Sequence, residues 1–296
     1  MSETTTPPRP NYLGIRSIME PLIMDDRKWA KVPDIPADCF MLDLEDSVPP
    51  AQKTDARAKV VEYLGRLDYF DGRIVMARPN PLSTPWGHDD LVALARAGVG
   101  CLAYPKLSTA AEVREVQSIL RSEGADPDIF AIIETARSVG NVEEIADSDK
   151  IVGLMFGPGD LSVDSGVPLF ADGKTLNPAL LYPRVRTVLA GAAAGVVTAE
   201  IAFMEDIRNQ DEARLKYGLS RRDGFRAGIT FYPPHVAIIN EVQGVSPEEV
   251  DDAHMVVETY SAAVARGDAA ITLENGRTLL VHDYEKAVAA LVRAAR

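Results

Sequence analysis

The sequence feature that most constrains the fold is a regular alternation of short apolar runs with longer segments of helical spacing. This alternation continues almost to the C-terminus and is typical of repeated β-α units. The runs that we predict to be strands span residues 14–19, 39–44, 74–77, 100–104, 129–133, 151–156, 196–201 and 227–231. Eight parallel strands close a (β/α)8 barrel, so we predict a TIM barrel of the α/β class.

The segments between these runs predict the helices that cover the barrel. Several of them open with Ser, Thr, Asp or Pro, which favour a helix N-terminus. They span residues 51–64, 89–97, 110–122, 139–146, 178–194 and 206–217. The first connection, which contains Pro21 and Pro33, has no clear helical pattern.

The chain continues past the eighth run into a C-terminal extension. Residues 246–266 open with a Ser-Pro-Glu-Glu start signal and carry apolar residues at helical spacing, which predicts a long helix. A hairpin around Asn275-Gly276 and a last helix over 284–296 follow. We therefore predict a barrel domain over residues 1–243 and a helical extension over residues 244–296.

Composition and charge exclude several classes of protein. Of the 296 residues, 46% are hydrophobic and 25% charged, which is typical of a globular protein and not of a disordered chain. The formal charge of −13 repels phosphate backbones and anionic lipids, so we expect no nucleic-acid or membrane partner. Residues 1–10 lack a signal-peptide pattern, and two cysteines are too few for a disulfide framework, so we expect a cytoplasmic protein.

Polar residues follow most of the predicted strands at the point where each run ends. Active sites of such barrels lie at the C-terminal ends of the strands, so these residues are the candidates for chemistry. They are Asp43, Glu45 and Asp46 after the second run, Arg78 and Asn80 after the third, Lys106 after the fourth, Glu134 after the fifth, and Gly157, Pro158, Gly159 and Asp160 after the sixth.

Two of these carboxylates form a candidate metal site. Glu134 and Asp160 end consecutive strands, and adjacent parallel strands lie about 4.8 Å apart, so both side chains can reach one hard cation. Mg²⁺ is the natural choice because it takes one or two protein carboxylates and leaves positions for substrate oxygens, and Mn²⁺ fits almost as well. The alternative is that the two carboxylates cap helices or pair with arginines.

Other strand-end residues are candidates for substrate binding. The Gly-Pro-Gly turn at 157–159 offers amides to a carboxylate or oxyanion. Arg78 carries a charged fork suited to a carboxylate or enolate oxygen, although it could instead form a rim salt bridge with Asp43 or Glu45. Lys106 would form a Schiff base only if burial lowered its pKa; beside carboxylates, a charged, anion-binding or structural role is favoured.

Taken together, these motifs resemble the HpcH/HpaI aldolase and citrate lyase β subunit superfamily, which includes CitE-like proteins and malyl-CoA lyases. The resemblance covers most of the chain and implies a barrel enzyme that cleaves carbon-carbon bonds next to an enolate. It rests on Arg16-Ser17, MLDLEDSVP at 41–49 with Lys53 and Arg57, Arg78 with Asn80, Pro105-Lys106, IIET at 132–135 and GPGDLS at 157–162.

The resemblance assigns roles to the strand-end residues. It implies Glu134 and Asp160 as magnesium ligands. It also implies that Arg78 holds the substrate carbonyl or carboxylate, and that the turn at 157–160 is an amide cradle.

The same resemblance extends to the surrounding polar residues. It places Asp43, Glu45 and Asp46 in the catalytic machinery, where Glu45 and Asp46 arrange the waters around the metal. Arg16 and Lys106 are expected among the substrate-binding residues.

The sequence departs from the family pattern at three places, one of which is YPPH at 232–235, where the family often has a His-Pro-x-Gln segment. A Pro-Gly-Asn type turn that helps to seat coenzyme A is replaced by MEPL at 19–22, which leaves coenzyme A binding open. The family's C-terminal aspartate, which enters a neighbouring subunit's site, is replaced by Leu280, with Asp283 three residues later. The sequence therefore does not identify the proton-transfer group.

The leading hypothesis is an Mg²⁺-dependent carbon-carbon lyase or aldolase that cleaves or forms a small hydroxy or oxo acid, or its coenzyme A thioester, through a metal-stabilised enolate. The alternatives are an acyl-CoA thioesterase, a condensing enzyme of the malate-synthase kind, and a non-catalytic citrate-lyase-like subunit. The C-terminal extension resembles arms that pack on neighbouring subunits, so we expect a homotrimer or hexamer.

Overall fold

The computed structural model describes residues 10–173 and 175–295, and the chain forms two compact units, Met1–Asn240 and Glu241–Arg296. Residues 1–9, most of the segment expected to lack a signal peptide, lie outside the described residues, as does Arg296 of the predicted last helix. Each unit has a hydrophobic core of its own.

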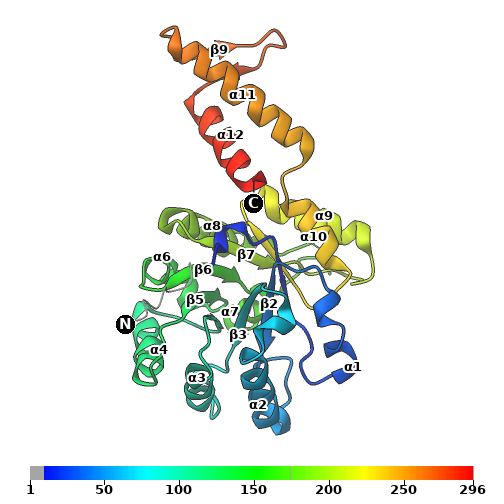
Figure 1. Cartoon of the computed structure of the whole chain (residues 1–296), viewed down its shortest axis with the longest axis vertical. Coiled ribbons are helices and arrows are strands. Elements are labelled where there is room, and N and C mark those ends of the chain that lie inside the picture. The colour runs from blue at the N-terminus through cyan, green and yellow to red at the C-terminus, as the bar shows by residue number, and fades with distance from the viewer. Residues whose placement is uncertain (1–9, 174, 296) are drawn as a thin grey trace, which may run out of the picture. The chain divides into compact units, whose positions relative to one another are not determined.

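The first unit is the predicted barrel. Its eight parallel strands pair in chain order, and β1 closes the ring by pairing with β8. Figure 1 shows the strands at the centre of this unit, with helices around them. The strands are β1 (Ser17–Met19), β2 (Cys39–Asp43), β3 (Ile74–Arg78), β4 (Cys101–Tyr104), β5 (Asp128–Ile133), β6 (Ile151–Phe156), β7 (Val197–Ile201) and β8 (Ala227–Thr230).

Burial on both faces of the barrel explains why the strands are continuous apolar runs. In β2, Cys39 and Met41 belong to one buried cluster, formed by the alternate strand residues that fill the barrel. Phe40 and Leu42 belong to the other cluster, which the strands share with the surrounding helices. A strand that is covered on both sides needs apolar residues at every position, so the runs were readable from the sequence.

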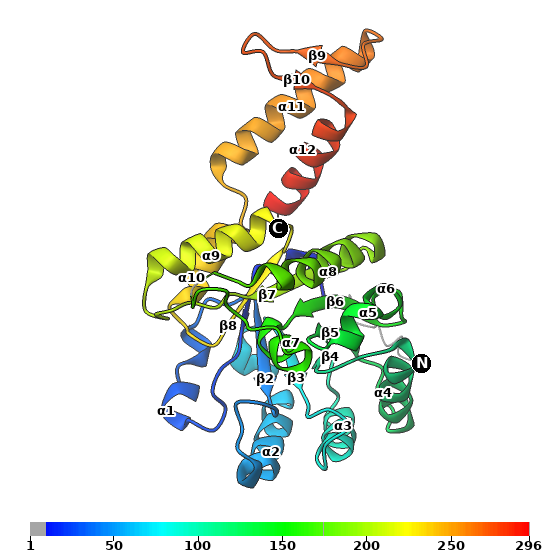
Figure 2. The ribbon, with the colours of Figure 1, turned by 180° about the vertical axis from the view of Figure 1, so that it is seen from behind.

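Helices connect the strands, and most lie where the sequence predicts them. Figure 2 shows α2, α3 and α4 on the outside of the strands from the opposite side. The helices of the first unit are α1 (Asp26–Trp29), α2 (Lys53–Leu64), α3 (Gly87–Arg96), α4 (Ala110–Ser122), α5 (Ala136–Gly140), α6 (Val142–Ala146), α7 (Pro158–Ser165), α8 (Leu181–Ala194) and α9 (Gln210–Arg222); α10 (His235–Gln243) follows β8.

Two helix predictions need correction, and the helices that follow β6 and β8 were not predicted. The segment 139–146 is two short helices that meet at Asn141. The segment 206–217 starts its helix later, because Asn209 accepts a hydrogen bond from the backbone N–H of Glu212 and forms the N-cap. Helices α7 and α10 were not predicted, since each is short and α7 opens with Gly and Pro, which read as a turn.

The second unit is a helical hairpin. Helix α11 (Pro247–Ala265) starts with a capping box between Ser246 and Glu249 and is followed by the short strands β9 (Ile271–Thr272) and β10 (Thr278–Leu279). Helix α12 (Val281–Ala294) packs against α11, with the rings of Tyr260 and Tyr284 5.6 Å apart. Among all described residues, no helix has the length and apolarity needed to cross a bilayer.

Candidate active site

The carboxyl ends of the barrel strands surround a cavity of about 250 Å³. Chain direction places these ends together, because all eight strands are parallel. Residues from five strand ends and apolar side chains line the cavity: Glu20, Asp46, Arg78, Glu134, Gly157, Gly159 and Asp160 with Met41, Ile132, Met155, Phe156, Ile201, Phe203, Ile229 and Phe231. At least one candidate predicted after each of the second, third, fifth and sixth runs therefore lines this site.

Arg78 lies at the centre of an ion-pair network at the end of β3. Asp43 and Arg78 are register partners in β2 and β3, and the Nε of Arg78 donates to Oδ1 of Asp43 at 2.5 Å. Its Nη2 donates to Oε1 of Glu20 at 3.2 Å, and Nε lies 3.7 Å from Oε2 of Glu45. The rim salt bridges considered as an alternative for Arg78 are thus present, and the guanidinium also faces the cavity.

Asp43 acts as the fixed anchor of this network. It is fully buried, and its two oxygens also accept from the backbone N–H groups of Glu45 and Ser47 and from the Ser47 hydroxyl. Burial raises the pKa of Asp43, but the Arg78 charge and these hydrogen bonds outweigh burial and hold the pKa below its ordinary value. Asp43 therefore stays ionised and orients Arg78.

Glu45 and Lys106 form a second pair next to Arg78. The Nζ of Lys106 lies 2.8 Å from Oε1 of Glu45 and 3.9 Å from Oδ1 of Asp160. Burial lowers the pKa of Lys106, but the hydrogen bond and charge of Glu45 and the charges of Asp160 and Glu134 raise it above its ordinary value. Lys106 is accordingly a charged residue, which disfavours the Schiff-base role and favours binding of an anion.

Glu134 is the most deeply buried carboxylate that lines the cavity. It is 4% exposed, and one of its oxygens, Oε1, accepts from the backbone N–H of Lys106 at 2.9 Å. That contact comes with a left-handed backbone at Lys106, whose φ is 53°. Burial, then the charges of Glu45 and Asp160, raise the pKa of Glu134 well above its ordinary value. The cavity thus holds more negative charge than its cationic side chains neutralise.

Asp160 stands at the mouth of the same cavity, in the first turn of α7. Its side chain is 41% exposed, in contrast to Glu134. No group of three or more His, Cys, Asp or Glu side chains that could hold a metal ion occurs in the part of the chain that the structure describes. Glu134 and Asp160 therefore remain the two candidate acidic ligands, a number that would suit Mg²⁺ with its remaining positions open.

The predicted amide cradle at 157–160 is narrower than expected. The N–H of Gly157 donates to the Ile133 carbonyl within the barrel, and Pro158 has no N–H. Gly157 is the N-cap of α7, so the donors left for a ligand are those of Gly159 and Asp160, which have no carbonyl partner within the helix. These two N–H groups therefore belong to the first turn of α7 and not to an irregular Gly-Pro-Gly turn, as the sequence had predicted.

Gly157 has a second role, which a substitution can test. A Cβ at Gly157 would lie 2.8 Å from both Cβ and Oε2 of Glu134, whereas its φ of −107° is open to alanine. We therefore expect Gly157→Ala to keep the fold but to displace the Glu134 carboxylate, lowering Mg²⁺ affinity about 10- to 100-fold in isothermal titration calorimetry. Gly140→Ala is the matched control, because a Cβ at Gly140 would meet nothing within 4 Å. Wild-type affinity in Gly157→Ala would contradict the prediction.

Arg16 was predicted to bind substrate, and the structure corrects this. Arg16 precedes β1, so it lies at the amino end of the barrel, opposite to the cavity. Its Nε and Nη2 each donate to Asp38, which precedes β2, at 2.9 Å. Arg16 thus joins two strand starts and cannot reach the strand ends.

Lys53 and Asn80, which are part of the family resemblance, are buried beside the cavity and hold the backbone that follows β2. The Nζ of Lys53 donates to the backbone carbonyls of Leu44 and Glu45 at 2.7 and 2.6 Å and to Oδ1 of Asn80 at 2.7 Å. Both side chains are buried. They fix the backbone after β2 and so position Glu45 toward Lys106.

Glu20 was missed as a site residue. It directly follows β1, lines the cavity and pairs with Arg78. The rule that singled out the other candidates, a polar residue just after a strand, also applies to Glu20. In the sequence analysis, the segment 19–22 was considered only because it lacks the Pro-Gly-Asn type turn that helps to seat coenzyme A.

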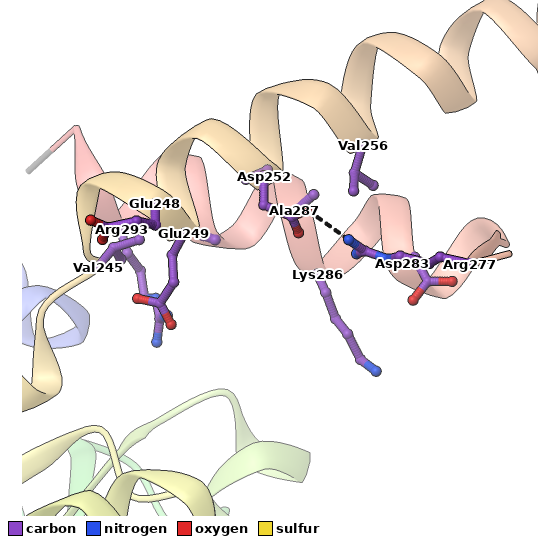
Figure 3. Close-up of a pocket in the computed structure, with 12 residues that line it drawn as sticks. Val245, Glu248, Glu249, Asp252, Val256, Arg277, Asp283, Lys286, Ala287 and Arg293 are labelled. Atoms are coloured by element: carbon purple, nitrogen blue, oxygen red, sulfur yellow. Dashed lines mark hydrogen bonds and ion pairs between the residues drawn. The ribbon is translucent and has the colours of Figure 1, made fainter. Parts of the chain in front are cut away.

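The second unit contains a separate cavity of about 350 Å³ between α11 and α12. Figure 3 shows charged side chains around it, including Arg277, which pairs with Asp252 at 2.6 Å. Asp283, considered as a substitute for the family's C-terminal aspartate, caps α12 by accepting from the backbone N–H of Leu280 at 2.9 Å. The side chains of Arg277 and Asp252 are 41% and 48% exposed, and none of the carboxylates that line this cavity is as buried as Glu134.

Comparison with known proteins identifies the family of the chain and several relatives. The family described as HpcH/HpaI aldolase/citrate lyase matches residues 26–225. The citrate lyase subunit beta of Leuconostoc mesenteroides subsp. cremoris is 30% identical, over 81% of this chain and 80% of the relative. A (3S)-malyl-CoA thioesterase of Cereibacter sphaeroides is 27% identical, over 84% of each chain.

A solved structure is similar along almost the whole chain. It is that of the protein CitE from Mycobacterium tuberculosis in complex with magnesium, acetoacetate and coenzyme A. The two share 25% of their residues, with a TM-score of 0.78, and the match covers 95% of this chain and 98% of that one.

Proposed function

Because the chain belongs to the HpcH/HpaI aldolase/citrate lyase family, we propose that it is an Mg²⁺-dependent carbon-carbon lyase acting on a small hydroxy or oxo acid, free or as its coenzyme A thioester. The observation that carries this proposal is the shared cavity of Glu134, Asp160 and Arg78 at the carboxyl end of the barrel. Two acidic metal ligands and one permanent cation are the groups needed to bind such an acid through its oxygens.

The residues of the cavity fit a divalent cation. Carboxylates outnumber cationic side chains in and beside the cavity, and Glu134 is buried among them with a raised pKa. Glu134 and Asp160 would hold the ion. When bound, Mg²⁺ would supply Lewis-acid polarisation of a substrate oxygen, and Mn²⁺ would supply the same. The CitE structure contains magnesium, which supports Mg²⁺ as the ion bound in this family site.

The chain's own residues have distinct tasks in the proposed reaction. Arg78, oriented by Asp43, binds a substrate carboxylate or carbonyl and opposes the negative charge that develops when the carbon-carbon bond breaks. Lys106, held by Glu45 next to Arg78, and the helix-start amides of Gly159 and Asp160 provide further donors. Asp46 lines the mouth and contributes to the ordering of water there.

Coenzyme A and the oligomeric state belong to the same proposal. The CitE structure contains coenzyme A, which supports a thioester substrate, whereas the MEPL segment at 19–22 replaces the expected turn and favours a free acid. We further propose that residues 244–296 pack on a neighbouring subunit of a homotrimer or hexamer.

A thioesterase is the second candidate, favoured by the 27% identity to a (3S)-malyl-CoA thioesterase. Hydrolysis would use the same oxygen-binding groups, but a water would attack the thioester carbonyl and the coenzyme A thiol would leave, with the carbon-carbon bond intact. A condensing enzyme of the malate-synthase kind would run the carbon-carbon step in the other direction. A subunit that binds substrate without turnover is the remaining candidate.

One experiment separates the lyase, the thioesterase and the non-catalytic subunit. The purified protein is incubated with malyl-type coenzyme A esters and free hydroxy and oxo acids, with Mg²⁺ or EDTA, and glyoxylate, pyruvate, acetate and free thiol are quantified. We expect Mg²⁺-dependent carbon-carbon cleavage. Free thiol without a cleavage product would establish the thioesterase, and ligand binding without any product would establish the non-catalytic subunit.

Mg²⁺ binding is expected to depend on pH. The raised pKa of Glu134 means that a proton competes with the cation for this carboxylate. Affinity should therefore rise with pH, by up to about tenfold per pH unit while Glu134 remains protonated in the free protein, and binding should release a proton. Calorimetry in two buffers of different ionisation enthalpy measures both quantities. An affinity that is independent of pH, with no proton released, would contradict the prediction.

A further inference from the structure

Glu20 is the cavity residue that has no task in the reaction described above. It follows β1, and its backbone N–H donates to the carbonyl of Thr230 in β8 at 2.8 Å, which fixes its position in the barrel. Its side chain is 12% exposed and lines the cavity together with Arg78, Glu134 and Asp160. A carboxyl group in this place can reach a ligand that the other three residues bind.

A purely structural ion pair does not account for Glu20. Arg78 already has a fully buried counterion, Asp43, which is held by three further hydrogen bonds. A second carboxylate on the same guanidinium adds negative charge to a site that already has an excess of it. Glu20 is also bound more loosely, at 3.2 Å compared with 2.5 Å for Asp43.

Burial and the charged groups around Glu20 bring the pKa of its carboxyl group close to neutral pH. Burial raises the pKa of Glu20, Arg78 opposes this, and the charges of Asp43, Asp46 and Glu45 raise it further, to about 7. A group with a pKa near the working pH can both accept and donate a proton. The other carboxyl groups are committed to the ion, to Arg78 or to Lys106, or lie exposed at the mouth.

We propose that Glu20 is the proton-transfer residue of this site, an inference that rests on the proposed lyase function. The Glu20 carboxylate takes the proton of the substrate hydroxyl, and the carbon-carbon bond breaks as that oxygen becomes a carbonyl. The bonding electrons pass to the other fragment, which leaves as an enolate opposite Arg78. Glu20 then returns the same proton to the enolate carbon, so no further reactant is consumed and the carboxylate is regenerated.

The test uses Glu20→Gln, which keeps the shape of the side chain and an oxygen that accepts from Arg78 but cannot carry the proton. We expect kcat for cleavage to fall about 100-fold or more, with KM changed less than about threefold. The rise of kcat/KM with pH near neutrality should be lost. Exchange of the α-hydrogens of an enolisable product in D₂O, measured by NMR with Mg²⁺, should fall by the same factor.

Two controls keep the result specific. Asp38→Asn alters a carboxylate that pairs with an arginine, Arg16, at the opposite end of the barrel, and it should leave kcat and the pH profile unchanged. The Mg²⁺-induced rise in Tm should persist in Glu20→Gln, which shows that the metal site is intact.

The possible outcomes distinguish this inference from the proposed function. A Glu20→Gln protein with wild-type kcat and pH profile overturns the inference alone, as does a change in KM alone, which would make Glu20 a positioning residue for Arg78. A wild-type protein that neither cleaves the panel nor exchanges α-hydrogens overturns the lyase function, and this inference with it.

Discussion

Replacing Glu134 by glutamine is expected to abolish most Mg²⁺-dependent turnover while leaving the fold intact. Glutamine has the same shape and keeps an oxygen that accepts from the backbone N–H of Lys106, a bond of 2.9 Å in the wild type. It removes the negative charge that the cation requires. Losing several kcal/mol of charge stabilisation corresponds to a fall in kcat/KM of about 10²- to 10³-fold.

Glu134→Gln should raise the stability of the metal-free protein at neutral pH, although it lowers turnover. The pKa of Glu134 is higher in the folded than in the unfolded chain, because burial and the charges of Glu45 and Asp160 oppose ionisation. As pH rises above the unfolded value, the wild type therefore loses stability that the neutral glutamine does not lose. In EDTA we expect equal Tm values at low pH and a higher Tm for Glu134→Gln at neutral pH.

The matched control is Glu143→Gln, the same substitution on α6, where Glu143 pairs at the surface with Arg186 of α8. It should leave turnover unchanged and shift stability by no more than about 1 kcal/mol. Turnover at the wild-type rate in Glu134→Gln, or a Tm in EDTA below that of the wild type at neutral pH, would refute the assignment of Glu134.

Arg78→Met is expected to impair both stability and activity. The guanidinium is the counterion of Asp43, which is fully buried, and of Glu20, which is 12% exposed. Removing one partner of a buried pair leaves an uncompensated charge and lowers the free energy of unfolding by about 3–5 kcal/mol. Substrate affinity and turnover should fall together, because methionine offers no donor to the substrate carboxylate.

The destabilisation should depend on pH. Arg78 helps to hold the pKa of Asp43 below its ordinary value against the effect of burial. Stability from such a depressed pKa is present above the unfolded pKa and is lost as pH falls through the folded one. Urea unfolding should thus show the largest difference between wild type and Arg78→Met at neutral pH, and a smaller one in acid.

Two further variants show whether the effect of Arg78→Met comes from the lost charge, from the lost guanidinium fork, or from removal of any arginine. Arg78→Lys keeps the charge but not the fork that contacts Asp43 and Glu20 at once, so it should recover part of the stability and little of the turnover. Arg16→Met removes a half-exposed arginine at the other barrel end and should cost at most about 1 kcal/mol. A stability of Arg78→Met equal to that of the wild type would show that Asp43 does not need this counterion.

The barrel was predictable because each strand is a short apolar run that can be recognised by itself, and because this run recurs eight times along the chain. Each of the eight strands lies within or directly around a predicted run, and 151–156 coincides with β6. Strands buried on both faces must be apolar throughout, and parallel order places every strand end on one side. Glu134, Asp160 and Arg78 could therefore be assigned to one site from the sequence alone. Short helices such as α7 were missed because Gly and Pro at its start are equally compatible with a turn.

By itself, the sequence determined most of the residues at the barrel mouth, since strand order and direction place them there, although Glu20 was missed and Arg16 was wrongly included. Only the tertiary structure decided which of them meet. Glu20 and Arg78 are 58 residues apart, and Glu45 and Lys106 are 61 apart, so their pairing follows from closure and stagger of the barrel. The same closure places Arg16 at the opposite end with Asp38. Side-chain partners across strands depend on register and rotamer, which no local pattern in the chain encodes.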